Sequence, residues 1–200
     1  MNTSNKLNIF AQVRELPVAA AIGFCATMLE RQVPNFTLFC QVCEFETEGQ
    51  MEKAQNQLWL AYDAVKAKRK VTTNMGLLRD KVEAIAPDAH EYDNFGVYPA
   101  IDCAMAMVGA ISLVAGDEPQ GAVMLSKLSQ GSVEAVILAT EGELDNQEVK
   151  VHPLMQREVE FQRELLNLLT SGNKHLPSAE RLQDLALQDG ATNIGIEVEV

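Results

Sequence analysis

Hydrophobic residues along this chain recur mainly at intervals of three and four positions, the spacing of one face of an α-helix. Within residues 48–69 these positions form a narrow apolar face: Met51, Ala54, Leu58, Ala61 and Val65. The same spacing predicts amphipathic helices over residues 119–140 and 153–171. A shorter helix is expected between Ser178, whose hydroxyl suits an N-terminal cap, and Gly190.

One segment, residues 98–115, is apolar on all sides except at Asp102 and Ser112. A helix of this composition is expected at the centre of the fold, covered on every side. Gly116 is expected to end it, because glycine readily adopts the left-handed conformation that terminates helices. Asp117 is then expected to cap the next helix.

Two further local signals refine these helices. Thr47-Glu48-Gly49-Gln50 has the spacing of a capping box and predicts the start of the helix in 48–69. In 119–140, the small residues Gly121, Ser132 and Ala135 are expected to allow a neighbouring helix to approach closely.

Alternation of apolar and polar residues, the pattern of a strand, occurs only at the end of the chain, through Ile194, Ile196, Val198 and Val200. We expect an extended tail that docks on its own chain through Ile194 and Ile196. The alternative is that the tail pairs with another chain, since an exposed strand edge is a template for association. The sequence thus predicts a single all-α domain over residues 1–200, a compact bundle of about nine helices with an extended C-terminal tail.

Charge and composition exclude some partners. The 200 residues carry 28 acidic and 16 basic side chains, a net charge of −12. Such a surface repels phosphate backbones, so no nucleic-acid partner is expected.

The N-terminal residues lack the features of a signal peptide. The apolar run from Leu16 to Leu29 is shorter than the 18 or more residues of a typical membrane span. We therefore expect a cytoplasmic protein with no membrane partner and with reduced cysteines.

Motifs of cofactor and metal chemistry are missing from the sequence. It has no glycine-rich nucleotide loop, no G-x-S-x-G and no H-E-x-x-H, and its three histidines complete no Glu-x-x-His pair. A Ser-His-Asp triad stays open, because triads assemble in space rather than along the chain. Cys40 and Cys43 have the spacing of a metal pair, but Cys25 and Cys103 lie alone in apolar helices. No cofactor and no metal are expected.

Asp102 is the most informative ionisable residue, because it stands on a helix otherwise free of charge. Its position just after Pro99 predicts a structural role, in which free N–H groups of the first turn stabilise the carboxylate. The alternative is a ligand-binding acid in a pocket with Tyr98 and Glu134.

Two other charged groups have simple interpretations. The basic run Lys66–Lys70 is expected to complement the C-terminal end of a helix, with a docking patch for an acidic partner as the alternative. Glu158, Glu160 and Glu164 share one helix and are expected to form a solvated acidic face.

The run Asn94–Asp102 (NFGVYPAID) resembles the YjaG family, bacterial proteins of unknown function. The likeness extends to Pro34–Phe36, to Ser126-Lys127 and to Asn193–Ile196, and so covers nearly the whole chain. The resemblance implies a compact, helical, cytoplasmic protein. It implies no reaction, cofactor or catalytic residue.

Two functions fit these observations. The first is a non-enzymatic helical protein that acts through contact with another protein or through self-association. The second is a small-molecule-binding protein or an enzyme whose pocket lies near Tyr98 and Asp102, with Glu134 as a further candidate.

Overall fold

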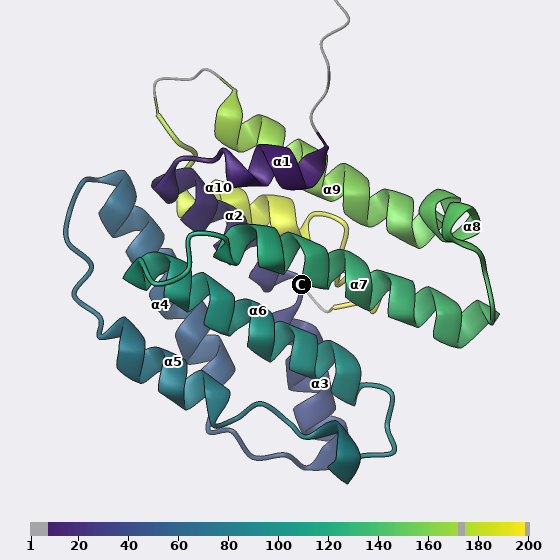
Figure 1. Ribbon diagram of the computed structural model, residues 1–200. Helices are drawn as coiled ribbons and strands as arrows, with labels where there is room; N and C mark the ends of the chain where they lie inside the picture. Colours follow the sequence, from purple (N-terminus) through teal and green to yellow (C-terminus); the bar gives the residue numbers. More distant parts are fainter. Residues whose placement is uncertain (1–7, 172–174, 199–200) are drawn as a thin grey trace, which may run out of the picture.

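The computed structural model describes residues 8–171 and 175–198, and confirms that this part of the chain is all-α (Figure 1). Ten α-helices and one 3-10 helix follow in order: α1 (Ile9–Arg14), α2 (Val18–Glu30), α3 (Val33–Cys43), α4 (Gln50–Lys66), α5 (Met75–Glu83), η1 (Ala89–Glu91), α6 (Val97–Ala115), α7 (Gly121–Glu141), α8 (Asn146–Val151), α9 (Pro153–Thr170) and α10 (Ala179–Leu187). Two of them, α1 and α8, have only six residues.

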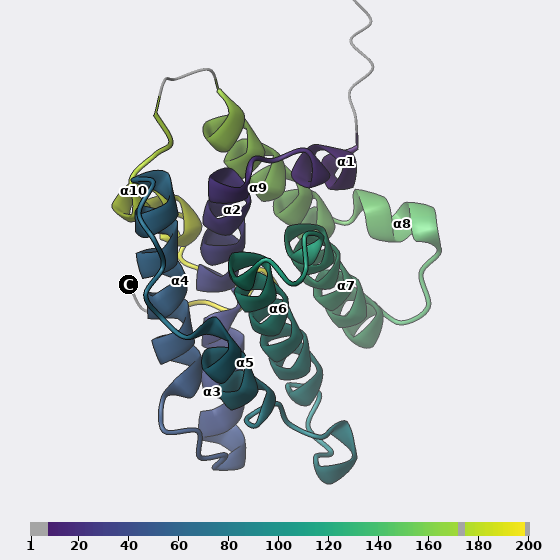
Figure 2. The same cartoon turned by 60° about the vertical axis from the view of Figure 1, so that its left-hand side comes forward.

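Helices α2 and α6 lie between two groups of helices, as the rotated view in Figure 2 shows. Helices α3, α4 and α5 pack on one side, and α1, α7, α8 and α9 lie on the other. Nearly all of α2 is buried, in keeping with its apolar sequence. The candidate site described below lies in the second group.

Helices α6 and α7 approach each other so closely that their backbones touch. A Cβ atom placed on Gly121 would lie 2.3 Å from the carbonyl oxygen of Gly109. The prediction that Gly121 permits a close helix approach is therefore confirmed. Ser132, on the same side of α7, is buried as well.

The predicted ends of the helices are partly right. Gly116 ends α6 with a φ of 85°, and the Ser178 hydroxyl accepts a hydrogen bond from the Arg181 N–H at 3.2 Å, as predicted. Asp117 does not cap α7, whose first residues have no side-chain cap. Instead Asp117 accepts a hydrogen bond from Arg79 of α5 at 3.0 Å.

The predicted capping box at Thr47–Gln50 is wrong. The N-cap of α4 is Gly49, which makes no side-chain cap. Both Glu48 and Gly49 adopt the left-handed conformation, with φ of 53° and 65°. This backbone path carries the Thr47 hydroxyl away from the first N–H groups of α4, which the capping box would have needed.

The prediction that α6 is covered on every side is also wrong along one strip. Tyr98 is 52% exposed and Met105 is 48% exposed. The neighbouring helices cover the other faces of α6 and leave this strip open to solvent. By length and composition alone, α6 and α7 are each apolar enough to cross a membrane. In the fold, 67% of the apolar stretch of α6 is buried against other helices, as is 44% of that of α7.

The C-terminal segment docks on its own chain but is not an extended strand. The Thr192 N–H donates to the Ile196 carbonyl at 2.8 Å, and the Val198 N–H donates to the Gly190 carbonyl at 2.9 Å, so the chain forms a tight loop. Gly195 has a φ of 86°, a conformation that permits this turn. A loop forms instead of the predicted extended segment, because Asn193 finds hydrogen-bond partners in the bundle, Asn35 and Ser129.

Docking through the predicted residues is confirmed. Ile194 is 8% exposed and packs in a cluster with Val133, Ile137 and Met155, and Ile196 is partly buried against the same cluster. Val200, the last residue of the predicted pattern, lies outside the described residues.

We expect Gly121→Ala to destabilise the protein by about 1–3 kcal/mol, because the added methyl group must push α7 away from the backbone of α6. The matched control is Gly131→Ala on the same helix, where a Cβ atom meets nothing within 4 Å. That change should leave the protein unchanged or stabilise it by up to about 1 kcal/mol. Thermal unfolding followed by circular dichroism measures both; equal melting temperatures for the two variants would contradict the close contact.

Candidate functional site

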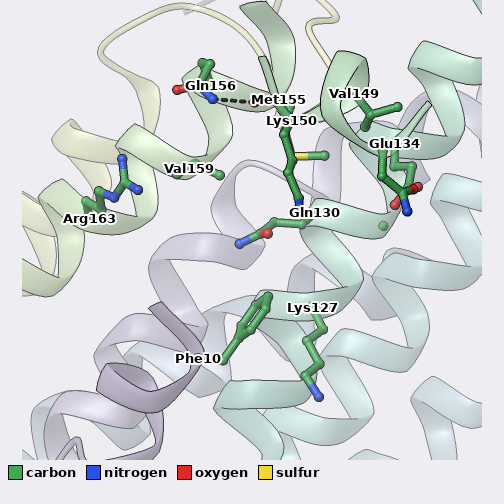
Figure 3. A pocket seen from close by; sticks show the side chains of 12 residues that line it. Phe10, Lys127, Gln130, Glu134, Val149, Lys150, Met155, Gln156, Val159 and Arg163 are labelled. Carbon is green, nitrogen blue, oxygen red and sulfur yellow. Dashed lines mark hydrogen bonds between the residues drawn. The ribbon is translucent and has the colours of Figure 1, made fainter. Parts of the chain in front are cut away.

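A cavity of about 590 Å³ opens between α1, α7, α8 and α9 (Figure 3). A second cavity of about 680 Å³ shares its walls at Phe10, Gln130, Lys150 and Arg163. We call the two together the α7–α9 groove. Its lining is apolar at five positions that come from three helices: Ile9, Phe10, Val149, Met155 and Val159.

Cations gather around this apolar lining. Lys127 of α7, Lys150 of α8 and Arg163 of α9 are exposed side chains that line the groove. Among the described residues, none of the three forms an ion pair. Glu134 is the one carboxylate in the described lining. The groove is thus locally cationic in a chain whose net charge is −12.

Lys127 and Phe10 lie together at one side of the groove, where the Lys127 ammonium is 5.7 Å from the centre of the Phe10 ring. This cation–π contact joins α1 to α7 at the edge of the cavity. Figure 3 also shows Arg163 on a separate wall, formed by α9. The cations therefore border the groove from different helices.

The position of Lys150 is set by a capping box at the start of α8 and by a hydrogen bond between α8 and α9. Asp145 accepts from the Gln147 and Glu148 N–H groups at 2.7 and 2.9 Å, and Glu148 accepts from the Asp145 N–H in return. These backbone hydrogen bonds lower the pKa of Asp145. Beyond Lys150, the Gln156 amide donates to the Lys150 carbonyl. This capping box and this contact fix α8 against the start of α9.

Beneath the groove lies a network of buried polar side chains. The side-chain amide of Gln130, in the groove wall, donates to the side-chain oxygen of Gln162 at 3.1 Å. The same oxygen accepts from the Ser126 hydroxyl at 2.6 Å. The Gln162 amide in turn donates to Glu158 at 2.8 Å. The wall of the groove is therefore hydrogen-bonded to the core.

At the centre of this network is a buried ion pair that sequence reasoning missed. Arg31 donates to Glu158 at 2.9 Å, and both side chains are almost fully buried. The Ser129 hydroxyl donates to the other carboxylate oxygen at 2.6 Å. The Arg31 guanidinium lies 3.9 Å from the centre of the Phe161 ring, and burial lowers its pKa.

The expectation that Glu158 belongs to a solvated acidic face is therefore wrong. Its neighbour Glu160 is exposed, so the two carboxylates lie on opposite sides of α9. A signal for the network was present on α7, where three serines recur at every third position: Ser126, Ser129 and Ser132. Each donates its hydroxyl to an acid or an amide on a neighbouring helix.

The structure does not bring the three predicted site residues into one cavity. The Ser132 hydroxyl donates to Asp102 at 2.6 Å, across the contact between α7 and α6. Tyr98 is exposed, with its ring 5.7 Å from that of Phe95. Glu134 lines the α7–α9 groove, to which Tyr98 and Asp102 do not contribute.

The predicted capping role of Asp102 is wrong. Helix α6 begins at Val97, so Asp102 lies beyond the first turn and its carboxylate faces α7 instead of free N–H groups. Burial raises its pKa, and the hydrogen bond from Ser132 opposes that shift. Asp102 is thus a half-buried acid held at a helix contact.

The four cysteines differ in burial. Cys25 and Cys103 are fully buried, whereas Cys40 and Cys43 are half-buried on α3. Burial raises the pKa of Cys40 to about 11. Within the described ranges, no group of three or more histidine, cysteine, aspartate or glutamate side chains is placed to hold a metal ion.

Fold and groove together define the class: an all-α bundle with an apolar-floored, cation-bordered groove on one side. The chain belongs to the family described as a protein of unknown function (DUF416), whose model matches residues 8–197.

Similar proteins confirm the resemblance to YjaG. An uncharacterised protein of Haemophilus influenzae is 34% identical over 180 residues, 88% of this chain and 90% of that protein. The uncharacterised protein YjaG of Escherichia coli is 29% identical over 178 residues, 88% of this chain and 89% of that protein. The crystal structure of a DUF416 family protein from Shewanella baltica matches with a TM-score of 0.85 and 26% identity, covering 96% of this chain and 100% of that one.

We expect Glu158→Gln to destabilise the protein by about 3–5 kcal/mol, because it removes the nearer counter-charge of the buried Arg31 guanidinium and leaves only the partly exposed Asp189, at 3.7 Å. Glu160→Gln is the control, since Glu160 is exposed on the same helix. It should change the free energy of unfolding by less than about 0.5 kcal/mol. Urea unfolding measures both; a similar small effect of the two substitutions would show that the buried pair carries no stability.

Asp102→Asn should have a pH-dependent effect. Burial raises the pKa of Asp102 in the folded protein. The protonated carboxyl therefore contributes stability below the ordinary aspartate pKa of about 4, and this contribution is lost as the pH rises through the raised pKa. The asparagine keeps an oxygen that can accept from Ser132. The melting temperature of the variant relative to the wild type should therefore be higher at pH 7 than at pH 4. The opposite trend would mean that the carboxylate is stabilised in the fold.

Proposed function

We propose that this protein is a non-enzymatic binding module that holds a segment of a partner protein in the α7–α9 groove. The observation that carries the proposal is the lining of the groove. An apolar floor surrounded by hydrogen-bonding side chains is the usual make-up of a recognition site. The described lining has no cysteine, serine, threonine or histidine, and its one carboxylate, Glu134, has no second acid in the lining with which to share acid–base catalysis.

The walls of the groove also support a binding role. Gln130 is tied through Gln162 to the buried pair of Glu158 and Arg31, so the wall is held before a partner arrives. A preformed groove loses little conformational entropy on binding, which leaves more of the contact energy for affinity.

The size of the groove favours a second candidate, a small-molecule ligand. The cavity of about 590 Å³ lies within the roughly 300–1,000 Å³ typical of small-molecule sites. In that case Glu134 would contact the ligand, whereas the other two predicted ligand-binding residues, Tyr98 and Asp102, lie outside the groove. The continuation into a second cavity argues for the longer occupant, a protein segment.

A variant that fills the groove tests the proposal. Gly131 lines the cavity, and a Cβ atom placed there meets nothing within 4 Å, so the side chain of Gly131→Leu should extend into the groove without disturbing α7. The control is Ala139→Leu, an exposed position of the same helix outside the lining.

Tagged wild-type protein and the Ala139→Leu variant should recover the same partner from the native host, identified by mass spectrometry. The Gly131→Leu variant should lose it, with an unchanged melting temperature. Recovery of the same partner by all three proteins would show that binding does not use the groove.

A further inference from the structure

We infer that the segment held in the α7–α9 groove is an acidic amphipathic helix, with carboxylates that meet Lys127, Lys150 and Arg163 and apolar side chains that cover the floor. This inference rests on the proposed function and names the chemistry of the partner.

The charges of the groove carry the inference. Its three cations come from α7, α8 and α9, and within the described part of the chain none of them forms an ion pair. Arg31, Arg79 and Arg157, by contrast, are each paired with a carboxylate of this chain. Other cations, Lys68, Arg69 and Lys70 among them, also lie outside the described ion pairs, but the three groove cations combine their positive field with an apolar floor. A ligand with carboxylates complements that field.

The floor of the groove decides between acidic partners. Phe10, Met155 and Val159 offer hydrocarbon surface, which a phosphate backbone would leave uncovered. The net charge of −12 further repels a long polyanion, whereas a short peptide feels mainly the nearby cations. An amphipathic helix presents apolar residues at spacings of three and four and carboxylates beside them, so it satisfies both the floor and the cations.

The basic run after α4 is the natural comparison surface. Lys68, Arg69 and Lys70 are exposed and, like the groove set, comprise two lysines and one arginine. They do not line the groove. Neutralising either set changes the net charge of the protein equally, so a difference between the two isolates the local effect of the groove.

The test uses a fluorescein-labelled peptide of about 18 residues, with leucines at helical spacing and glutamates on the flanking positions. Fluorescence anisotropy measures its affinity for the full chain. Replacing Lys127, Lys150 and Arg163 together by glutamine should weaken binding about tenfold, and the same replacement of Lys68, Arg69 and Lys70 should change it less than about twofold. A peptide with glutamine in place of every glutamate should bind wild type as weakly as the acidic peptide binds the groove variant.

Three results would overturn the inference: equal loss in the two triple variants, equal binding of the acidic and glutamine peptides, or tighter binding of a single-stranded DNA of similar length. Failure here is distinguishable from failure of the proposed function. If the peptide does not bind but Gly131→Leu still abolishes capture of the cellular partner, the groove binds a segment of different chemistry. If Gly131→Leu retains that partner, the groove is not the binding surface.

Discussion

The buried carboxylate of Glu158 is the constraint on which much of this structure depends. An ionised group removed from water must be given donors, and here they come from three separate helices: Arg31 at the end of α2, Ser129 of α7 and Gln162 of α9 itself. Meeting that requirement fixes how α2, α7 and α9 cross. Helices α7 and α9 contribute residues to both apolar clusters of the core, so the polar contact at Glu158 links the two clusters.

The same constraint gives the groove its mixed character. Its inner wall is anchored, because Gln130 bonds to Gln162, which also bonds to Ser126 and Glu158. Its outer border is formed by long cationic side chains that point into solvent and meet no carboxylate among the described residues. A rigid base and adjustable charged edges suit recognition of a segment whose apolar residues must fit closely while its acidic residues vary in position.

The sequence predicted what depends on local spacing. The central helix, its end at Gly116, the Ser178 cap and the close approach at Gly121 all follow from residues within a few positions of one another. The burial of Glu158 did not, because its partner Arg31 is 127 positions away and its acidic neighbours conceal it. The role of Asp102 failed for a related reason: moving the start of a helix by less than one turn converts a capping acid into a packing acid. The groove is assembled from four helices, so no local pattern could have indicated it.

The loop around Asn193 has a consequence for how the helices are coupled. The side-chain oxygen of Asn193 accepts a hydrogen bond from the Asn35 amide at 2.8 Å, and its side-chain amide donates to the Ser129 hydroxyl oxygen at 3.2 Å. Its backbone N–H donates to the Arg31 carbonyl at 3.2 Å. These partners lie at the end of α2, in α3 and in α7, and all are at least 64 positions from Asn193 in the sequence. The loop is therefore a polar cross-link that joins helices from both sides of the bundle. Without the loop, the Asn35 amide and the Arg31 carbonyl would lose these partners, so the loop and the helices it joins are expected to unfold in one cooperative step.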